Sequence, residues 1–186
     1  MDSSVYIQIA KNAIQAYFDG TGVDKDRYVS MYPELSEKKA CFVTLTLYGR
    51  LRGCIGSIIA HQSLIDDLTA NAVSAAFHDP RFSSLSRAEF YEISVEVSLL
   101  THPKEVVYRD QIELKQIIRP YIDGVILRLN NHQATFLPQV WDELSDFDSF
   151  FAHLGLKAGI GSDPLSYHPE IYTYQVDKYE ENNDEH

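Results

Sequence analysis

Apolar residues recur at helical spacing near the start of the chain. They predict a helix over residues 4–18 that ends at Gly20, and its apolar stripe consists of Val5, Ile9, Ala13 and Ala16, widened by Tyr6 and Tyr17. The following residues 21–39 are polar, include a proline and show no clear period. We therefore predict a long loop between this helix and the first strand.

Two stretches alternate between apolar and polar residues, which is typical of half-buried strands. In residues 41–47 the inward positions are Cys41, Val43, Leu45 and Leu47. In residues 91–100 they are Ile93, Val95, Val97 and Leu99, with Ser94, Glu96 and Ser98 on the opposite face.

A tight turn is predicted at Tyr48-Gly49, leading into a second strand that carries Cys54. Pairing across this turn places Cys41 and Cys54 on one face of the hairpin. Their offset in register, together with the compartment inferred below, argues against a disulfide.

Capping signals mark the other helices. Ser63 resembles the start of a capping box and opens a helix that ends at Asp79-Pro80, because a proline disfavours helical geometry at the residue before it. One face of this helix is apolar, and another carries Asp67, Asn71, Ser74 and His78. Ser86 caps a short helix, residues 110–118 form another, and Asp146 opens the last one, which ends at Gly159.

The remaining strands lie toward the end of the chain. Residues 124–129 and 133–137 are predicted as a hairpin across 130–132, and residues 170–176 as a final strand. From Asp177 the chain is mostly charged or polar and is predicted to be frayed. Strands and helices mix without a regular β-α-β rhythm, so we predict an α+β fold with a largely antiparallel β-sheet flanked by helices.

Composition and charge narrow the function classes. The 186 residues, 45% of them hydrophobic, suffice for one domain with a real core. The formal net charge is −11 without any run of Lys or Arg, which disfavours nucleic-acid binding, because that binding depends on neutralising phosphates. No apolar stretch reaches the ~20 residues of a membrane span, and no signal pattern opens the chain. With only two cysteines, Cys41 and Cys54, the chain is predicted to be cytoplasmic, with no membrane partner.

The segment Leu51-Arg52-Gly53-Cys54-Ile55-Gly56 is the candidate for chemistry. Gly53 and Gly56 leave room for a ligand, and the Arg52 guanidinium favours the thiolate of Cys54, which is the nucleophilic form. The alternative is a small cysteine packed in a tight strand, as free cysteines most often are. The other cysteine, Cys41, points into the core by its alternation.

Four further residues are candidates for the site. His78 could act as a general base, or could only interact with the end of its helix. Glu96 is the best carboxylate for acid/base work if its face lines a cleft, and is merely solvated otherwise. Arg81 could bind an anion or pair with Asp79 around the turn, and Gln139 could reach a ligand by a hydrogen bond.

Other common site patterns are missing. The seven histidines contain no pair at metal-ligand spacing. The sequence has neither a glycine-rich phosphate loop nor a Gly-x-Ser-x-Gly elbow. We therefore predict no metal and no cofactor.

Six ordered blocks carry a family resemblance. They are residues 51–56, 75–82, 93–100, 124–127, 135–141 and 156–159. Together they resemble the AMMECR domain family, known in prokaryotes as protein A of the AmmeMemoRadiSam system, over nearly the whole chain from Pro33 to Tyr179.

The resemblance implies a two-lobed α+β protein with the hexapeptide near a cleft between unequal lobes. It implies a single domain over residues 1–179, followed by an acidic tail, 180–186, that we expect to be disordered. It also implies association with a Memo-like protein and a radical SAM protein. It implies no established reaction, since both catalytic and binding roles have been suggested for the family.

Two hypotheses from different classes follow. In the first, the protein is a cysteine-dependent enzyme acting on a small molecule or a modified group, with Cys54 as nucleophile, Arg52 as anion stabiliser, and Glu96 or His78 moving protons. In the second, it is a non-catalytic adaptor that binds a peptide, a metabolite or the Memo-like protein. RNA binding ranks below both because of the charge.

Overall fold

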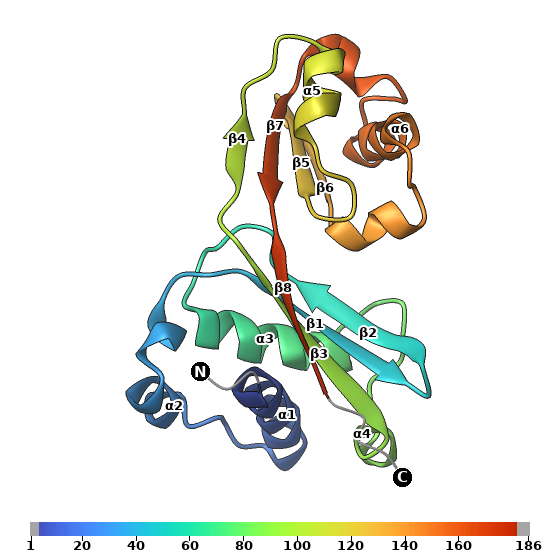
Figure 1. The fold of residues 1–186 in the computed structure, drawn as a ribbon. Coiled ribbons are helices and arrows are strands. Elements are labelled where there is room, and N and C mark those ends of the chain that lie inside the picture. The colour runs from blue at the N-terminus through green and yellow to red at the C-terminus, as the bar shows by residue number, and fades with distance from the viewer. Residues whose placement is uncertain (1–3, 182–186) are drawn as a thin grey trace. The chain divides into compact units, whose positions relative to one another are not determined.

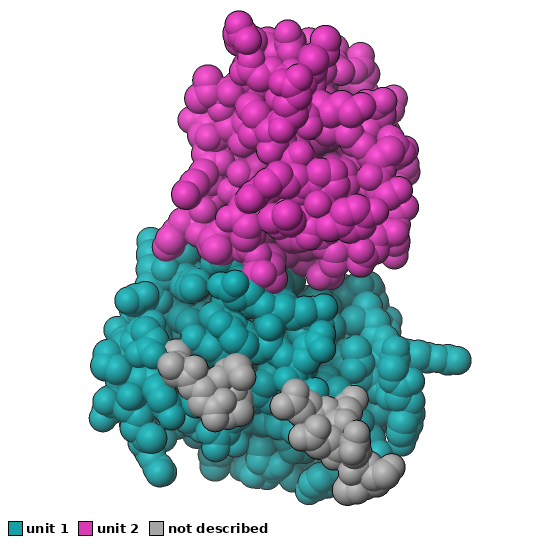
Figure 2. Space-filling view, in the orientation of Figure 1, with its two compact units in different colours: residues 1–100, 177–186 teal, residues 101–176 magenta. Residues whose placement is uncertain are grey.

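The computed structural model describes residues 4–181, and the chain divides into two compact units (Figure 1, Figure 2). The first unit comprises residues 1–100 and 177–186, and the second comprises residues 101–176. Each unit contains a four-stranded sheet and a hydrophobic core of its own. Among residues 4–181, six α-helices and two separate sheets with antiparallel pairing confirm the predicted α+β class.

The first unit packs helices against a sheet with the strand order β2-β1-β3-β8. Its strands are β1 (Cys41–Leu47), β2 (Arg50–Gly56), β3 (Ile93–Leu100) and β8 (Val176–Glu180). Its helices are α1 (Ser4–Asp19), α2 (Lys25–Met31), α3 (Leu64–Phe77) and α4 (Arg87–Phe90), with a 3₁₀ turn at Pro33–Ser36. Both β2 and β3 run antiparallel to β1. Helices α1 and α3 cover one face of this sheet (Figure 1).

The covered face of this sheet supplies the core of the first unit. Leu45 and Val97 are fully buried there, and α3 packs Leu68 and Ala72, which are also fully buried, onto the same side. Burying a Leu or Val side chain stabilises the fold by about 1.5–3 kcal/mol. This burial fixes which side of each strand points inward, and leaves the alternate positions on the face away from α1 and α3.

The second unit has the strand order β4-β7-β5-β6. Its strands are β4 (Lys104–Val106), β5 (Gly124–Leu129), β6 (His132–Phe136) and β7 (Glu170–Tyr174). Its helices are α5 (Gln111–Ile117) and α6 (Phe147–Ala158), with 3₁₀ turns at Pro138–Asp142 and Pro164–Tyr167. The core is aromatic, because Trp141 stacks on Phe150 with ring centroids 3.7 Å apart, and its Nε1 donates to the carbonyl of Asp123.

Most predicted elements are confirmed, including their caps. The side chain of Ser63 accepts the N–H of Asp66, Ser86 forms a complete capping box, and Gly159 ends α6 with a φ of 81°. The loop predicted over residues 21–39 is wrong, since it contains α2 and a 3₁₀ turn, and β4 was not predicted.

Two boundaries near the hairpin of the second unit and the C-terminus also differ. His132 belongs to β6 rather than to the turn. The frayed segment predicted from Asp177 is instead β8 through Glu180, and the N–H of Glu181 donates to the carbonyl of Val95. The rest of the predicted tail, 182–186, lies outside the described residues. Within residues 4–181, none of the helices is long and apolar enough to cross a membrane.

Candidate functional site

A β-bulge sets the direction of the Cys54 side chain. The hairpin begins with Leu47 opposite Arg50, but the register shifts between Leu45 and Thr46, so that Thr44 lies opposite Cys54. An unbroken register would instead have put Cys54 opposite Val43, on the core face. The prediction that Cys41 and Cys54 share a face is therefore wrong. Both cysteines are free, with Cys41 buried and Cys54 only partly buried.

Cys54 stands in a row of polar side chains that crosses the sheet on the face away from α1 and α3. Thr44 pairs with Cys54 on one side and with Glu96 on the other. The Cys54 Sγ lies 3.2 Å from the Thr44 Oγ1, and the Glu96 carboxylate forms a 2.9 Å ion pair with Lys178 of β8. Glu96 is thus on the face of Cys54, as required for its predicted role, but one strand separates the two residues.

The outer edge of β2 is held at Cys54 by two residues that follow α3. The backbone N–H of Cys54 donates to the buried Asp79 carboxylate at 3.0 Å, and the Arg81 Nη2 donates to the Cys54 carbonyl at 3.3 Å. Arg81 also forms an ion pair with Asp79 at 2.7 Å. This hydrogen bonding by Arg81 lowers the pKa of Asp79 and raises the pKa of Arg81. The pair therefore satisfies backbone groups that a neighbouring strand would otherwise bind.

Arg52 is directed away from the thiol, which corrects its predicted role. Its guanidinium forms hydrogen bonds to both carboxylate oxygens of Glu89 and to the carbonyl of Ser83, at 2.8–3.1 Å. These hydrogen bonds lower the pKa of Glu89 to about 2. Within the described chain the buried Nη1 has no hydrogen-bond partner, and the Arg52 Cζ lies 5.9 Å from the Phe82 ring centroid. The guanidinium that contacts the Cys54 residue is that of Arg81.

The space next to both glycines of the hexapeptide is occupied by other residues of the protein and is not open to a ligand. A Cβ on Gly53 would come within 2.0 Å of the Ala75 carbonyl oxygen in α3. A Cβ on Gly56 would come within 2.1 Å of the Phe42 ring. The expectation that these glycines open the site is wrong, because each of them allows close packing instead.

His78 and Gln139 are not joined to Cys54 by the geometry. His78 caps the end of α3, its ring lies 6.0 Å from that of Tyr17, and it lines a groove between α1 and α3 on the helix side of the sheet. Gln139 is exposed in a 3₁₀ turn of the second unit. The structure therefore shows no contact of His78 or Gln139 with the Cys54 thiol that would support their predicted roles.

Cys41 belongs to a buried polar cluster on the core face. Its backbone N–H and its Sγ both donate to the buried Asp67 carboxylate, at 2.9 Å and 3.4 Å, and Asn71 donates to its carbonyl. Burial raises the pKa of the Cys41 thiol well above its ordinary value. The prediction of a core residue is confirmed, and part of the polar stripe on α3 is buried with it.

Two residues of the site were missed by sequence reasoning. Thr44 lies in a predicted strand but was not a candidate, and Lys178 lies in the segment predicted to be frayed. A glycine inside a strand often marks a bulge, so Gly53 was the signal that could have placed Cys54 opposite Thr44. Among residues 4–181, no group of three or more His, Cys, Asp and Glu side chains is placed to hold a metal ion.

Comparison with known proteins identifies the family of this chain. The AMMECR1 family profile matches residues 7–179. Protein MJ0810 of Methanocaldococcus jannaschii is 36% identical over 180 residues, which cover 94% of this chain and 88% of that protein. A protein of Methanococcoides burtonii is 35% identical over 179 residues, covering 94% and 86%.

A solved structure has the same fold. The crystal structure of the uncharacterized protein PH0010 from Pyrococcus horikoshii matches with a TM-score of 0.86 and 30% identity, covering 97% of this chain and 91% of that one. The family profile and the relatives extend over nearly all of the sequence, through both compact units. The chain therefore belongs to the AMMECR1 family.

Proposed function

We propose that the protein is a cytoplasmic, cysteine-dependent enzyme that acts on a small molecule or on a modified group of another molecule. One observation carries the proposal. The bulge turns Cys54 out of the core. The residue is only partly buried, and its Sγ lies 3.2 Å from the Thr44 Oγ1. A cysteine that only filled space would lie on the core face, as Cys41 does.

The roles of the neighbouring residues follow from their contacts. Cys54 is the nucleophile, and the Thr44 hydroxyl donates a hydrogen bond to its sulfur when the thiol has lost its proton. Asp79 and Arg81 hold the backbone of β2 at this residue, so they position the sulfur. Glu96 lies across Thr44 and would act on a proton of the bound substrate rather than on the thiol itself.

Alkylation of the native protein tests the proposal. With iodoacetamide at neutral pH, followed by peptide mass spectrometry, Cys54 should be labelled in the folded protein and Cys41 only after unfolding, because Cys41 is buried. Thr44→Val should slow the labelling of Cys54, whereas Thr46→Val, on the same strand face, should not. Labelling of Cys54 only in the unfolded chain would make it a packing residue and contradict the proposal.

A binding function is the second candidate, and the glycines favour it. Because the space at Gly53 and Gly56 is taken by Ala75 and Phe42, the hexapeptide has a packing role that needs no substrate. In residues 4–181 neither an imidazole nor a carboxylate is hydrogen-bonded to the Cys54 Sγ, whose partner is a hydroxyl. In this case the protein is an adaptor for a Memo-like protein, in company with a radical SAM protein.

Co-purification separates the two candidates. An adaptor should be retained by an immobilised Memo-like protein at moderate salt, and Cys54→Ala should leave this retention unchanged. An enzyme should lose its role in the cell with Cys54→Ala or Cys54→Ser, whether or not it is retained. Absence of retention at high protein concentration would rule out the adaptor function for this partner.

A further inference from the structure

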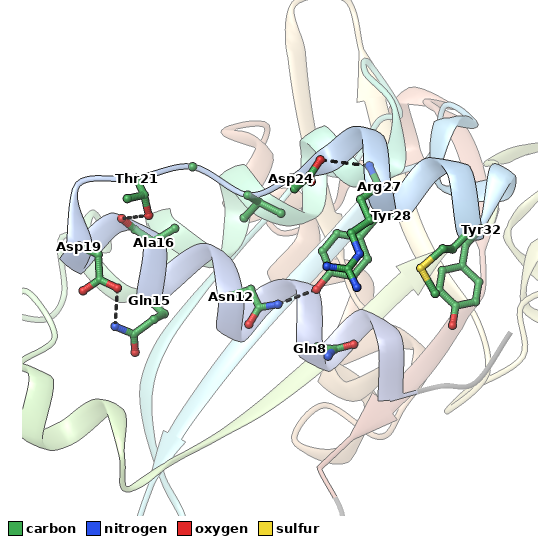
Figure 3. A pocket seen from close by; sticks show the side chains of 13 residues that line it. Gln8, Asn12, Gln15, Ala16, Asp19, Thr21, Asp24, Arg27, Tyr28 and Tyr32 are labelled. Carbon is green, nitrogen blue, oxygen red and sulfur yellow. Dashed lines mark hydrogen bonds between the residues drawn. The ribbon is translucent and has the colours of Figure 1, made fainter.

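A second concave surface of the first unit lies between α1 and α2 (Figure 3). It is on the helix side of the sheet, whereas Cys54 points to the opposite face. The groove has a volume of about 480 Å³. Pockets that bind small molecules commonly measure about 300–1,000 Å³. Its walls are α1 on one side, α2 and Tyr32 on the other, and residues 21–24 at one end.

The α1 wall carries a ladder of carboxamides. Gln8, Asn12 and Gln15 follow at helical spacing, so they share one face of α1. The Asn12 Nδ2 donates to the Tyr28 hydroxyl at 2.5 Å, and the Gln15 Nε2 donates to Asp19 at 3.0 Å. Among residues 4–181, the Asn12 carboxamide oxygen and the whole Gln8 amide have no side-chain hydrogen-bond partner, so they are available to a ligand. A carboxamide offers an acceptor and a donor side by side.

The α2 wall carries a positive charge and an apolar, aromatic surface. Within the described part of the chain, the guanidinium of Arg27 has no carboxylate partner, although the sequence contains 27 acidic and only 16 basic residues. The two carboxylates that line the groove are engaged, Asp24 with the α2 backbone and Asp19 with Arg87. Met31 is 58% exposed. Tyr32 is half-buried and completes this wall.

We propose that this groove binds a purine nucleoside monophosphate. Asn and Gln carboxamides match the donor and acceptor pattern on the edge of adenine. Gln8 presents both groups, and Asn12 adds its acceptor oxygen along the same wall. Tyr32 and Met31 give the base a surface on which to stack. The Arg27 guanidinium binds the phosphate, since its planar set of donors fits phosphate oxygens. The site is independent of Cys54 chemistry.

Isothermal titration of the full chain with adenosine monophosphate, adenosine and inorganic phosphate tests this site. The monophosphate should bind at least about tenfold more tightly than either of its parts. Arg27→Gln should weaken the binding of the monophosphate by about tenfold and leave the binding of adenosine unchanged, whereas Gln8→Ala should weaken the binding of both. Arg109→Gln, an exposed arginine of the second unit, is the matched control and should change neither. Cys54→Ala should also bind normally.

Three results would overturn the proposal. They are no saturable binding of the monophosphate up to about 1 mM, phosphate binding as tightly as the nucleotide, and an unchanged affinity in Arg27→Gln. Circular dichroism checks that the variants fold. If one does not, amide chemical-shift mapping on the wild-type chain decides, because shifts confined to residues 8–32 support the site and shifts elsewhere contradict it.

Discussion

Gly53 is the residue that lets β2 and α3 come together next to the bulge. The Ala75 carbonyl oxygen lies where a Gly53 Cβ would be, so any side chain must push the helix backbone away from the strand. In the sequence, a glycine beside a cysteine is as consistent with space for a ligand as it is with close packing. The sequence could not decide between the two uses, because α3 approaches β2 only in the folded chain.

Substitution of this glycine distinguishes packing from ligand access. Gly53→Ala should lower the free energy of unfolding by about 1–3 kcal/mol, because a buried Cβ is forced against helix backbone. Urea denaturation measures it. Gly22→Ala is the control, since its added Cβ meets nothing within 4 Å, and its effect should stay within about 0.5 kcal/mol. A Gly53→Ala protein as stable as the wild type would show that the space is not needed for packing.

The pair between Arg52 and Glu89 makes stability depend on pH. The folded-state pKa of Glu89, about 2, lies below its ordinary 4.5, so the pair stabilises the fold at pH values above the ordinary pKa and this is lost as the pH falls toward 2. Glu89→Gln keeps the capping box but removes the charge. At pH 7 it should cost about 1–2 kcal/mol, since the 31% exposed carboxylate is partly screened by solvent.

Urea midpoints of the Glu89→Gln and wild-type proteins, measured from pH 7 down to about 2, should converge at the acid end. The control is Glu113→Gln, whose partner Arg109 is 88% exposed, and it should change stability by no more than about 0.5 kcal/mol. A difference that stays constant over this pH range would mean that the Glu89 charge is not the cause.

At the scale of elements, the β1–β2 hairpin shows what alternation can and cannot predict. The bounds of β1 and the Tyr48-Gly49 turn are confirmed, because apolar alternation and turn chemistry are local properties. Alternation does not predict the bulge, which lies next to Gly53, where β2 packs against α3. One register shift turned Cys54 to the other face and separated it from Arg52. The sequence therefore predicted Cys54, Glu96 and the pairing of Arg81 with Asp79, but not the contacts of Thr44 and Lys178.

The turn of this hairpin can be improved. Tyr48 and Gly49 both have positive φ, at 52° and 78°, as in the two-residue turns that favour Asn-Gly. Tyr48→Asn should therefore raise the free energy of unfolding by about 0.5–1 kcal/mol in urea denaturation. Tyr91→Asn, at a similarly exposed tyrosine with negative φ, is the control and should give no gain. A loss of stability in Tyr48→Asn would mean that the ring makes contacts worth more than the strain.

The α-helix and the strands that the sequence did not predict contain no buried residue. None of the residues of α2 is buried, so no stripe marks it in the sequence. Strand β4 has three residues and no buried position, and it is held by pairing with β7. The charged strand β8 is held by the sheet of the first unit in the same way. Each forms through contacts with segments far away in the sequence, which periodicity does not report.

At the scale of the whole molecule, the chain builds two cores from interleaved segments. The first unit closes with β8, which follows the complete second unit along the chain. No core residue of the first cluster belongs to the second, as far as the described residues go. Alternation and capping predicted both sets of elements and the α+β class. They did not predict where the chain divides, because this depends on which elements share a core.

Because each unit has its own core, we expect the two units to unfold in separate transitions. The fluorescence of the single tryptophan can follow one of them. Trp141 is fully buried in the second unit, so its fluorescence follows that unit, whereas far-ultraviolet circular dichroism follows both. Leu68→Ala removes a fully buried side chain of the first core and should cost about 2–5 kcal/mol. The part of the dichroism change that comes from the first unit should then move to lower urea, while the fluorescence transition stays in place.

The matched variant reverses this pattern. Leu127→Ala empties a fully buried position in the second core and should shift the fluorescence transition by a similar amount. If Leu68→Ala instead shifts both transitions equally, the two units unfold as one cooperative body. In that case a substitution in either core would alter the candidate site at Cys54 through the stability of the whole protein.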